Sequence, residues 1–221
     1  MSNEQQAFKD PTSLAKWTKR FLYAQIVIWV IAIISSMLEY QLLSDFKNGV
    51  YSSQELAIAA ADASDAREGI VGILQLIIYI VSGILILKWI YRANYNVRQL
   101  GASDMQFSPG WSIGWYFIPI AYLWKPYQAM KEIWKASSNP QSWNSQSVSS
   151  LLPWWWFFWI VSNMAGYASF LVAMRAEEIN ELLEANVVTR LSDFTDIPLS
   201  LIVIGIISKV HEMQMSHAKV E

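Results

Sequence analysis

Two histidines near the carboxyl end are the side chains best suited to bind a metal ion. His211 is followed by Glu212, and the second histidine is His217. The His-Glu-x-x-His zinc motif needs its histidines four positions apart, so that both rings lie on one helix face. The wider spacing here puts the rings on different faces. The chain contains no cysteine, which excludes disulfides and thiolate metal sites. We therefore expect no metal and no cofactor.

Catalytic side chains are equally sparse. Acid-base chemistry would fall on Glu132, Asp104 or a histidine, and the order of residues pairs none of them with a nucleophile. We predict that the protein is not an enzyme. The formal net charge of -2 comes without any basic domain, so we also expect no nucleic-acid partner.

A few uncharged polar side chains interrupt the apolar stretches of the chain. Among them are Gln25, Gln75, Ser82, Asn163 and Ser200. Amides and hydroxyls inside membrane helices usually hydrogen-bond to neighbouring helices, and in some proteins they line an ion path. We take Gln75, Ser82 and Asn163 as the candidate intramembrane polar residues. The cores of these stretches, 21–38, 69–87, 151–174 and 197–208, contain no Asp, Glu, Lys, Arg or His, which disfavours an ion path.

Residues 92–137 combine the densest aromatic run of the chain with cations at both ends. Aromatic rings beside Lys and Arg are typical of segments that contact lipid headgroups or a partner. The candidate residues for such contacts are Arg92, Asn96, Arg98, Trp111, Trp115, Pro119, Trp124, Lys125, Pro126, Tyr127 and Trp134. Lys131 and Lys135 add further cations.

The composition indicates which environment positions these residues. Of 221 residues, 54% are hydrophobic and 15% are charged, whereas soluble domains have about 25% charged residues. Apolar stretches of spanning length predict four transmembrane helices. Their approximate bounds are 21–40, 69–91, 151–174 and 197–215. We expect one membrane domain at 21–215, between an amino-terminal segment, 1–20, and a tail, 216–221.

The central uncharged stretch, 105–124, does not fit a simple span. Ser108-Pro109-Gly110 predicts a turn and Pro119 interrupts the remainder. Trp111, Trp115, Ile118 and Tyr122 recur at helical spacing. We therefore predict an all-α integral membrane protein with four transmembrane helices in two hairpins and a central Trp/Pro-rich segment, re-entrant or interfacial.

The distribution of Lys and Arg predicts the orientation. With four crossings, one side holds twelve of these residues and the other holds four; a fifth crossing at 105–124 would change this to nine against seven. Because positive residues concentrate on the cytoplasmic side, four crossings are favoured, with both termini cytoplasmic.

The central stretch also carries a longer pattern. It has Arg92-Ala93, Asn96, Leu100-Gly101, Ser108-Pro109-Gly110-Trp111, Gly114-Trp115, Phe117-Ile118-Pro119, Leu123-Trp124-Lys125-Pro126-Tyr127-Gln128-Ala129-Met130 and Glu132-Ile133-Trp134. In this order the chain resembles, over residues 70–210, the bacterial membrane-protein family known as domain of unknown function 4328. The resemblance implies a multi-span protein of the bacterial inner membrane. It implies no catalytic residues, because that family has no assigned reaction.

Two functions remain as hypotheses. The first is a non-enzymatic membrane protein whose cytoplasmic aromatic-basic motif contacts membrane lipids, a protein partner or a second copy of the chain. The alternative is a small channel or transporter, since helices broken by Pro and Gly line the sites of such proteins.

Overall fold

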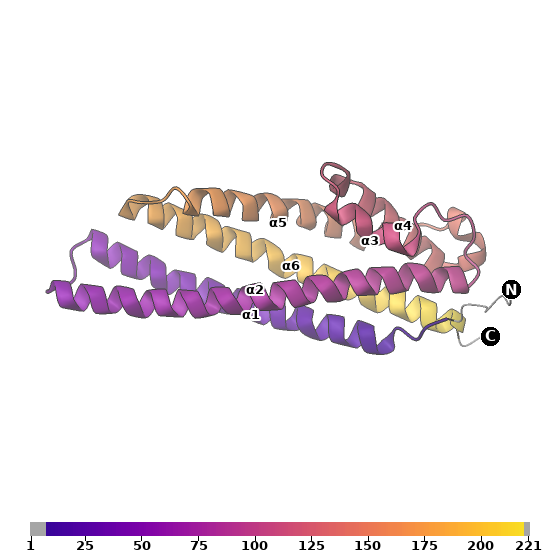
Figure 1. Cartoon of the computed structure of the whole chain (residues 1–221), viewed down its shortest axis with the longest axis horizontal. Helices are drawn as coiled ribbons and strands as arrows, with labels where there is room; N and C mark the ends of the chain where they lie inside the picture. The colour runs from indigo at the N-terminus through magenta and orange to yellow at the C-terminus, as the bar shows by residue number, and fades with distance from the viewer. Residues whose placement is uncertain (1–7, 219–221) are drawn as a thin grey trace. The chain divides into compact units, whose positions relative to one another are not determined.

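The computed structural model describes residues 8–218, and every regular element in this range is a helix (Figure 1). The first seven residues of the predicted amino-terminal segment and the last three of the tail lie outside the described residues. The four long helices are α1 (Thr12–Lys47), α2 (Gln54–Gln99), α5 (Leu151–Ala173) and α6 (Ile179–Ala218). Each is long and apolar enough to cross a membrane. The predicted all-helical fold with four such helices is confirmed.

Three of these helices are longer than a span requires. The 46 residues of α2 would measure about 69 Å, more than twice the ~30 Å hydrocarbon core. Ser53 caps its start, because its hydroxyl accepts the backbone N–H of Leu56 at 3.3 Å. At its end Gly101 has a φ of 98°, and Ala102 N–H bonds to Val97 O at 3.0 Å. This arrangement is a Schellman motif, which needs the left-handed conformation that glycine adopts freely.

The central segment, here residues 109–145, folds as several short helices. They are α3 (Pro109–Gly114), η1 (Trp115–Phe117), η2 (Ala121–Leu123), α4 (Lys125–Ser138) and η3 (Pro140–Ser145). The expected single helical face through Trp111, Trp115, Ile118 and Tyr122 is therefore wrong. Ile118 is extended, with a φ of -97° and a ψ of 117°, because the ring of a following proline disfavours the helical conformation. After Pro119, Ile120 has a φ of 67°, and the chain changes direction.

The chain divides into two compact units, and each of the helices α1, α2, α5 and α6 contributes to both. The described part of unit 1 comprises residues 8–21, 81–156 and 202–218. Unit 2 comprises residues 22–80 and 157–201. Each unit is described by itself.

Unit 1 is organised around the end of α2. Val97, Ala102, Met105, Ala136 and Trp143 form a buried apolar cluster. The indole Nε1 of Trp143 donates a hydrogen bond to Ser103 O at 2.8 Å, so even the polar atom of this ring is satisfied.

A buried glutamine connects three helices of unit 1. Gln214 of α6 donates hydrogen bonds to Ala93 O of α2 at 3.1 Å and to Ser137 Oγ of α4 at 2.9 Å. The end of α6 is thereby fixed between the end of α2 and the central segment.

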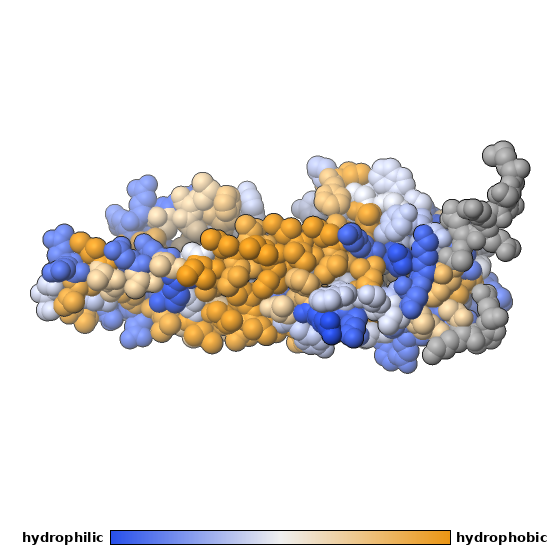
Figure 2. Space-filling view, turned by 60° about the horizontal axis from the view of Figure 1, so that its bottom comes forward, coloured by the Kyte–Doolittle hydropathy of each residue, from blue (hydrophilic) through white to orange (hydrophobic). Residues whose placement is uncertain are grey.

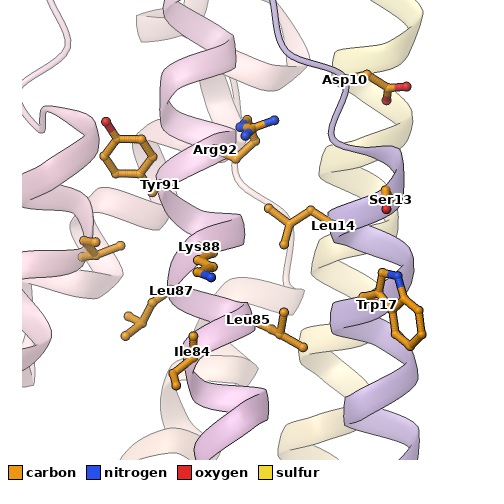
Figure 3. Close-up of a pocket in the computed structure, with 11 residues that line it drawn as sticks. Asp10, Ser13, Leu14, Trp17, Ile84, Leu85, Leu87, Lys88, Tyr91 and Arg92 are labelled. Carbon is orange, nitrogen blue, oxygen red and sulfur yellow. The ribbon is translucent and has the colours of Figure 1, made fainter.

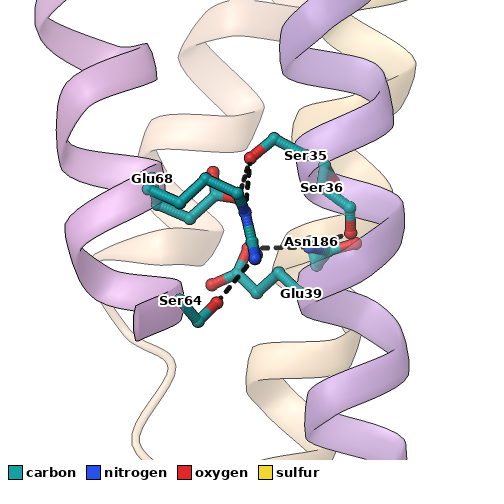
Figure 4. A network of polar contacts seen from close by, with 7 residues as sticks. Ser35, Ser36, Glu39, Ser64, Glu68 and Asn186 are labelled. Atoms are coloured by element: carbon teal, nitrogen blue, oxygen red, sulfur yellow. Dashed lines mark hydrogen bonds and ion pairs between the residues drawn. The ribbon is translucent and has the colours of Figure 1, made fainter. Parts of the chain in front are cut away.

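In unit 2 a polar network connects α1, α2 and α6 (Figure 4). Arg67 donates to Ser35 Oγ and to Ser64 Oγ, both at 2.9 Å. Ser35 donates in turn to Glu68 at 2.6 Å. On α6, the side-chain amide of Asn186 donates to Glu39 at 2.9 Å and to Ser36 O at 3.0 Å.

The outer surface of the apolar helices is strongly hydrophobic. On the unit 2 part of α2, the exposed large apolar residues include Ile70, Ile73, Leu74, Leu76, Ile77, Tyr79 and Ile80. Figure 2 shows hydrophobic side chains gathered in this way on the visible face. Side chains of this kind would be solvated by lipid tails.

Candidate functional site

The central motif, residues 92–137, lies entirely in unit 1, and part of it is bound internally. Arg98 donates hydrogen bonds from Nη2 to Phe107 O at 2.8 Å and to Met105 O at 3.3 Å. Its Nε donates to Asn94 Oδ1 at 3.1 Å, and Asn94 itself bonds to Phe107 O at 3.0 Å. The guanidinium of Arg98 therefore holds the loop that follows α2.

Glu132 holds the same loop from the other side. Its carboxylate oxygens accept the backbone N–H groups of Gln106 at 2.9 Å and Phe107 at 3.1 Å. The side chain is buried. A buried carboxylate that accepts two amide N–H groups forms charge-assisted hydrogen bonds, which fix its position.

Asn96 connects the motif to the chain before α1. It is fully buried, its Nδ2 donates to Lys9 O at 2.9 Å, and its Oδ1 accepts the Lys9 N–H at 3.2 Å. This paired geometry matches a backbone amide, so Asn96 fixes the approach of the chain to α1.

Lys125 lies among aromatic rings. Its Nζ is 5.6 Å from the ring centres of both Phe107 and Trp115, within the range of a cation–π interaction. Trp115 is in turn 4.8 Å from the ring of Trp111. Further along, Lys131 lies 5.6 Å from the ring of Tyr127. Two of the predicted cations are therefore paired with aromatic rings of the motif.

The outer face of the motif carries large apolar side chains. Those exposed are Trp111, Phe117, Ile120, Leu123 and Trp124. Phe117 and Ile120 are 72% and 68% exposed, which is costly for such residues in water. Pro126 and Trp134, by contrast, are buried. The predicted motif thus separates into an internal set and an exposed apolar set beside Lys125.

The candidate intramembrane polar residues are divided between the two units. Ser82 is buried in unit 1, whereas Gln75 and Asn163 belong to unit 2. Asn163 is exposed and its Nδ2 donates to Trp159 O of its own helix at 2.6 Å. Within the described residues, no group of three His, Cys, Asp or Glu side chains could hold a metal ion.

The sequence analysis missed an acidic contact in unit 2. Ser162 of α5 donates a hydrogen bond to Asp196 of α6, and Ser169 bonds to Thr189 at 2.7 Å. The stretch of α6 that faces α5 therefore includes Thr189 and Asp196, which precede the predicted span at 197–215. In the sequence, only the helical spacing between Thr189 and Asp196, which places both on one face of the helix, could have indicated that Asp196 faces α5.

These helices and their apolar surfaces define the class: a multi-pass helical membrane protein. A family model described as Domain of unknown function (DUF4328) matches residues 52–212. The chain belongs to this family, as the resemblance in the central stretch implied. No curated protein and no solved structure matches the chain.

Proposed function

We propose that this is a non-enzymatic membrane protein whose central motif contacts lipid headgroups at the cytoplasmic face of an inner membrane. One observation carries the proposal: Trp111, Phe117 and Ile120 are exposed on a short segment that leads to Lys125. Tryptophan prefers the headgroup level, and each cation near an anionic leaflet contributes about 1 kcal/mol. A protein partner or a second copy is the alternative occupant of the same face.

The folding of the segment supports this function. Its elements between Pro109 and Leu123 are at most six residues long. At about 1.5 Å per residue none of them approaches the ~30 Å hydrocarbon core. A short, broken segment with an apolar face is suited to lie along the membrane surface.

The experiment is a depth measurement on the full chain in lipid nanodiscs. Because the chain has no cysteine, Phe117→Cys can be labelled at one place with an environment-sensitive fluorophore. Nitroxides on the lipid headgroups or shallow acyl positions should quench it strongly. Gln141→Cys, an exposed polar position of the same unit, is the matched control and should be quenched much less. Equal, weak quenching at both positions would contradict lipid contact and favour a protein occupant.

The Asp196 contact favours a small channel or transporter as the second candidate. With 23 residues, α5 measures about 35 Å and needs nearly its full length to cross the membrane. Ser162 is near the middle of α5, so its partner Asp196 lies near the middle of the hydrocarbon core. Acidic residues at that depth commonly mark proton or ion paths.

Ion flux through proteoliposomes tests whether the protein is a channel or transporter. The reconstituted chain should conduct protons or a simple cation above the background of empty liposomes, and Asp196→Asn should reduce that flux. Asp62→Asn, at an exposed position of the same unit, should leave it unchanged. Flux equal to background for the unsubstituted chain would remove the candidate.

A further inference from the structure

Unit 1 contains a pocket of about 770 Å³ that is lined by the start of α1, the last third of α2 and Ile113 of α3. Figure 3 shows Arg92 and Leu85 of α2 and Leu14 of α1 projecting into the space between the two helices. Asp10, Ser13 and Arg92 lie toward one end of the pocket, and Ile84 and Leu85 lie toward the other. The pocket is therefore polar at one end and apolar at the other, and its volume is typical of a ligand site.

The polar end carries two cations from one helix face. Lys88 and Arg92 are one helical turn apart, and like charges at this spacing repel each other. The ion pairs among the described residues are Arg67–Glu68 and Lys209–Glu212. Neither Lys88 nor Arg92 therefore has an ion-pair partner in the described structure. An anion bound between them would relieve this repulsion. The planar guanidinium of Arg92 suits a phosphate, and Lys88 adds a point charge.

Asp10 is the single acidic residue that lines the pocket. Hydrogen bonds from the hydroxyl and then the backbone N–H of Thr12 lower the pKa of its carboxyl, so Asp10 remains ionised at neutral pH. The charged groups of the lining are then two positive and one negative. The pocket therefore retains a net positive charge and favours an anion.

The apolar end suits an acyl chain. It is lined by Leu14, Ile84, Leu85 and Leu87, with Trp17 and Tyr91 also in the lining. Trp17 is stacked with Arg20, whose guanidinium carbon is 4.9 Å from the ring centre. Aromatic rings near Lys and Arg at the end of an apolar helix are characteristic of the membrane–water interface, the level at which lipid phosphates lie.

We infer that this pocket binds one anionic phospholipid, with its phosphate between Lys88 and Arg92 and its first acyl carbons against Leu14 and Leu85. The inference rests on the part of the proposed function that places unit 1 at the membrane surface, and it does not require the central motif to contact lipid. It goes further by naming a stoichiometric site and the chemical class of its ligand.

Native mass spectrometry of the full chain in detergent tests the inference. The chain is titrated with palmitoyl-oleoyl-phosphatidylglycerol or, separately, with the zwitterionic phosphatidylcholine of the same chains. We expect one phosphatidylglycerol to bind preferentially. The double substitution Lys88→Gln and Arg92→Gln should weaken its binding roughly tenfold or more. Equal binding of the two lipids, or unchanged binding after the substitution, would overturn the inference.

Matched variants distinguish lipid binding in this pocket from general electrostatic attraction to the protein. The substitutions Lys16→Gln and Lys209→Gln remove two cations of the same unit outside both the pocket lining and the central motif, and they should leave the preference intact. Leu85→Trp fills the apolar end while keeping both cations, and it should also weaken binding. If Leu85→Trp has no effect, the acyl part of the inference is wrong.

A competition arm identifies the source of the phosphate. Inorganic phosphate and glycerol 3-phosphate, at millimolar concentration, should not displace the bound lipid. Displacement would mean that the site takes a soluble phosphate compound. The lipid-binding result is independent of the depth measurement at Phe117. Lipid binding in the pocket without quenching at Phe117 would reject the surface motif and retain the pocket. Quenching at Phe117 without lipid binding in the pocket would reject the pocket alone.

Discussion

Glu132 Oε2 accepts the backbone N–H of Phe107 at 3.1 Å, across 25 positions of the chain. Together with the bond to Gln106, it satisfies two amides of the loop between α2 and α3. Arg98 satisfies the carbonyl groups of the same loop. An acidic and a basic residue thus hold one loop through its backbone and form no ion pair with each other in the described structure.

Replacing Glu132 should therefore unfold this loop. Glu132→Ala leaves two backbone N–H groups without acceptors, at a cost of about 1–3 kcal/mol for each one that stays buried. The thermal midpoint of the full chain in detergent should fall by several degrees. Glu132→Gln keeps one acceptor oxygen and should lose less. Glu212→Ala, which removes an exposed ion pair, is the control and should change little. An unchanged midpoint for Glu132→Ala would refute the holding role.

Asn96 should control access to the chain before α1. Asn96→Leu removes both hydrogen bonds to Lys9, so the segment around Lys9 should separate from α2. Trypsin should then cleave after Lys9 several times faster than in the unsubstituted chain. Asn144→Leu, at an exposed position of unit 1, should leave the cleavage rate unchanged. Equal rates for both variants would show that Asn96 does not fix this segment.

The sequence predicted the helices far better than it predicted the roles of the motif residues. Hydropathy indicated four apolar helices because lipid solvation demands long uncharged stretches. It could not distinguish Arg98, which is bonded internally, from Lys125, which lies against rings. Both belong to the same aromatic-basic pattern, and their difference arises from long-range packing. Asp196 was missed because charge ended the predicted span, whereas the contact with Ser162 depends on the register of two helices.

Asn186 should stabilise unit 2 through its amide. Asn186→Leu removes the donors to Glu39 and to Ser36 O, leaving polar groups unpaired at a cost of about 1–3 kcal/mol. The loss should appear as faster hydrogen exchange in the segments of α1 and α6 that meet there. Asn48→Leu, at an exposed position in the same unit, provides the comparison. Protection equal to that of Asn48→Leu would contradict the role of Asn186.

Acid should loosen the start of α6. Hydrogen bonds from the backbone N–H groups of Glu177 and Glu178 lower the pKa of Glu181 from its ordinary value of 4.5. A lowered folded-state pKa gives stability that is present above the unfolded pKa and is lost as pH falls through the folded pKa. The measurement is hydrogen exchange of the backbone amides of Glu177 and Glu178, compared with Glu181→Gln at each pH. These amides should be protected from exchange at pH 6 and should lose that protection below about pH 4. Protection that does not depend on pH would contradict this cap.

The central claim is that the segment from 105 to 124 stays at one membrane surface, so that the loop at Ser145 is cytoplasmic. Ser145→Cys in this cysteine-free chain tests it with an impermeant maleimide on intact cells, with the exposed Ser52→Cys between α1 and α2 as the external control. The account predicts that Ser52→Cys is labelled in intact cells and Ser145→Cys only after the cells are opened. If both Ser145→Cys and Ser52→Cys are labelled in intact cells, residues 105–124 cross the membrane and the account is contradicted.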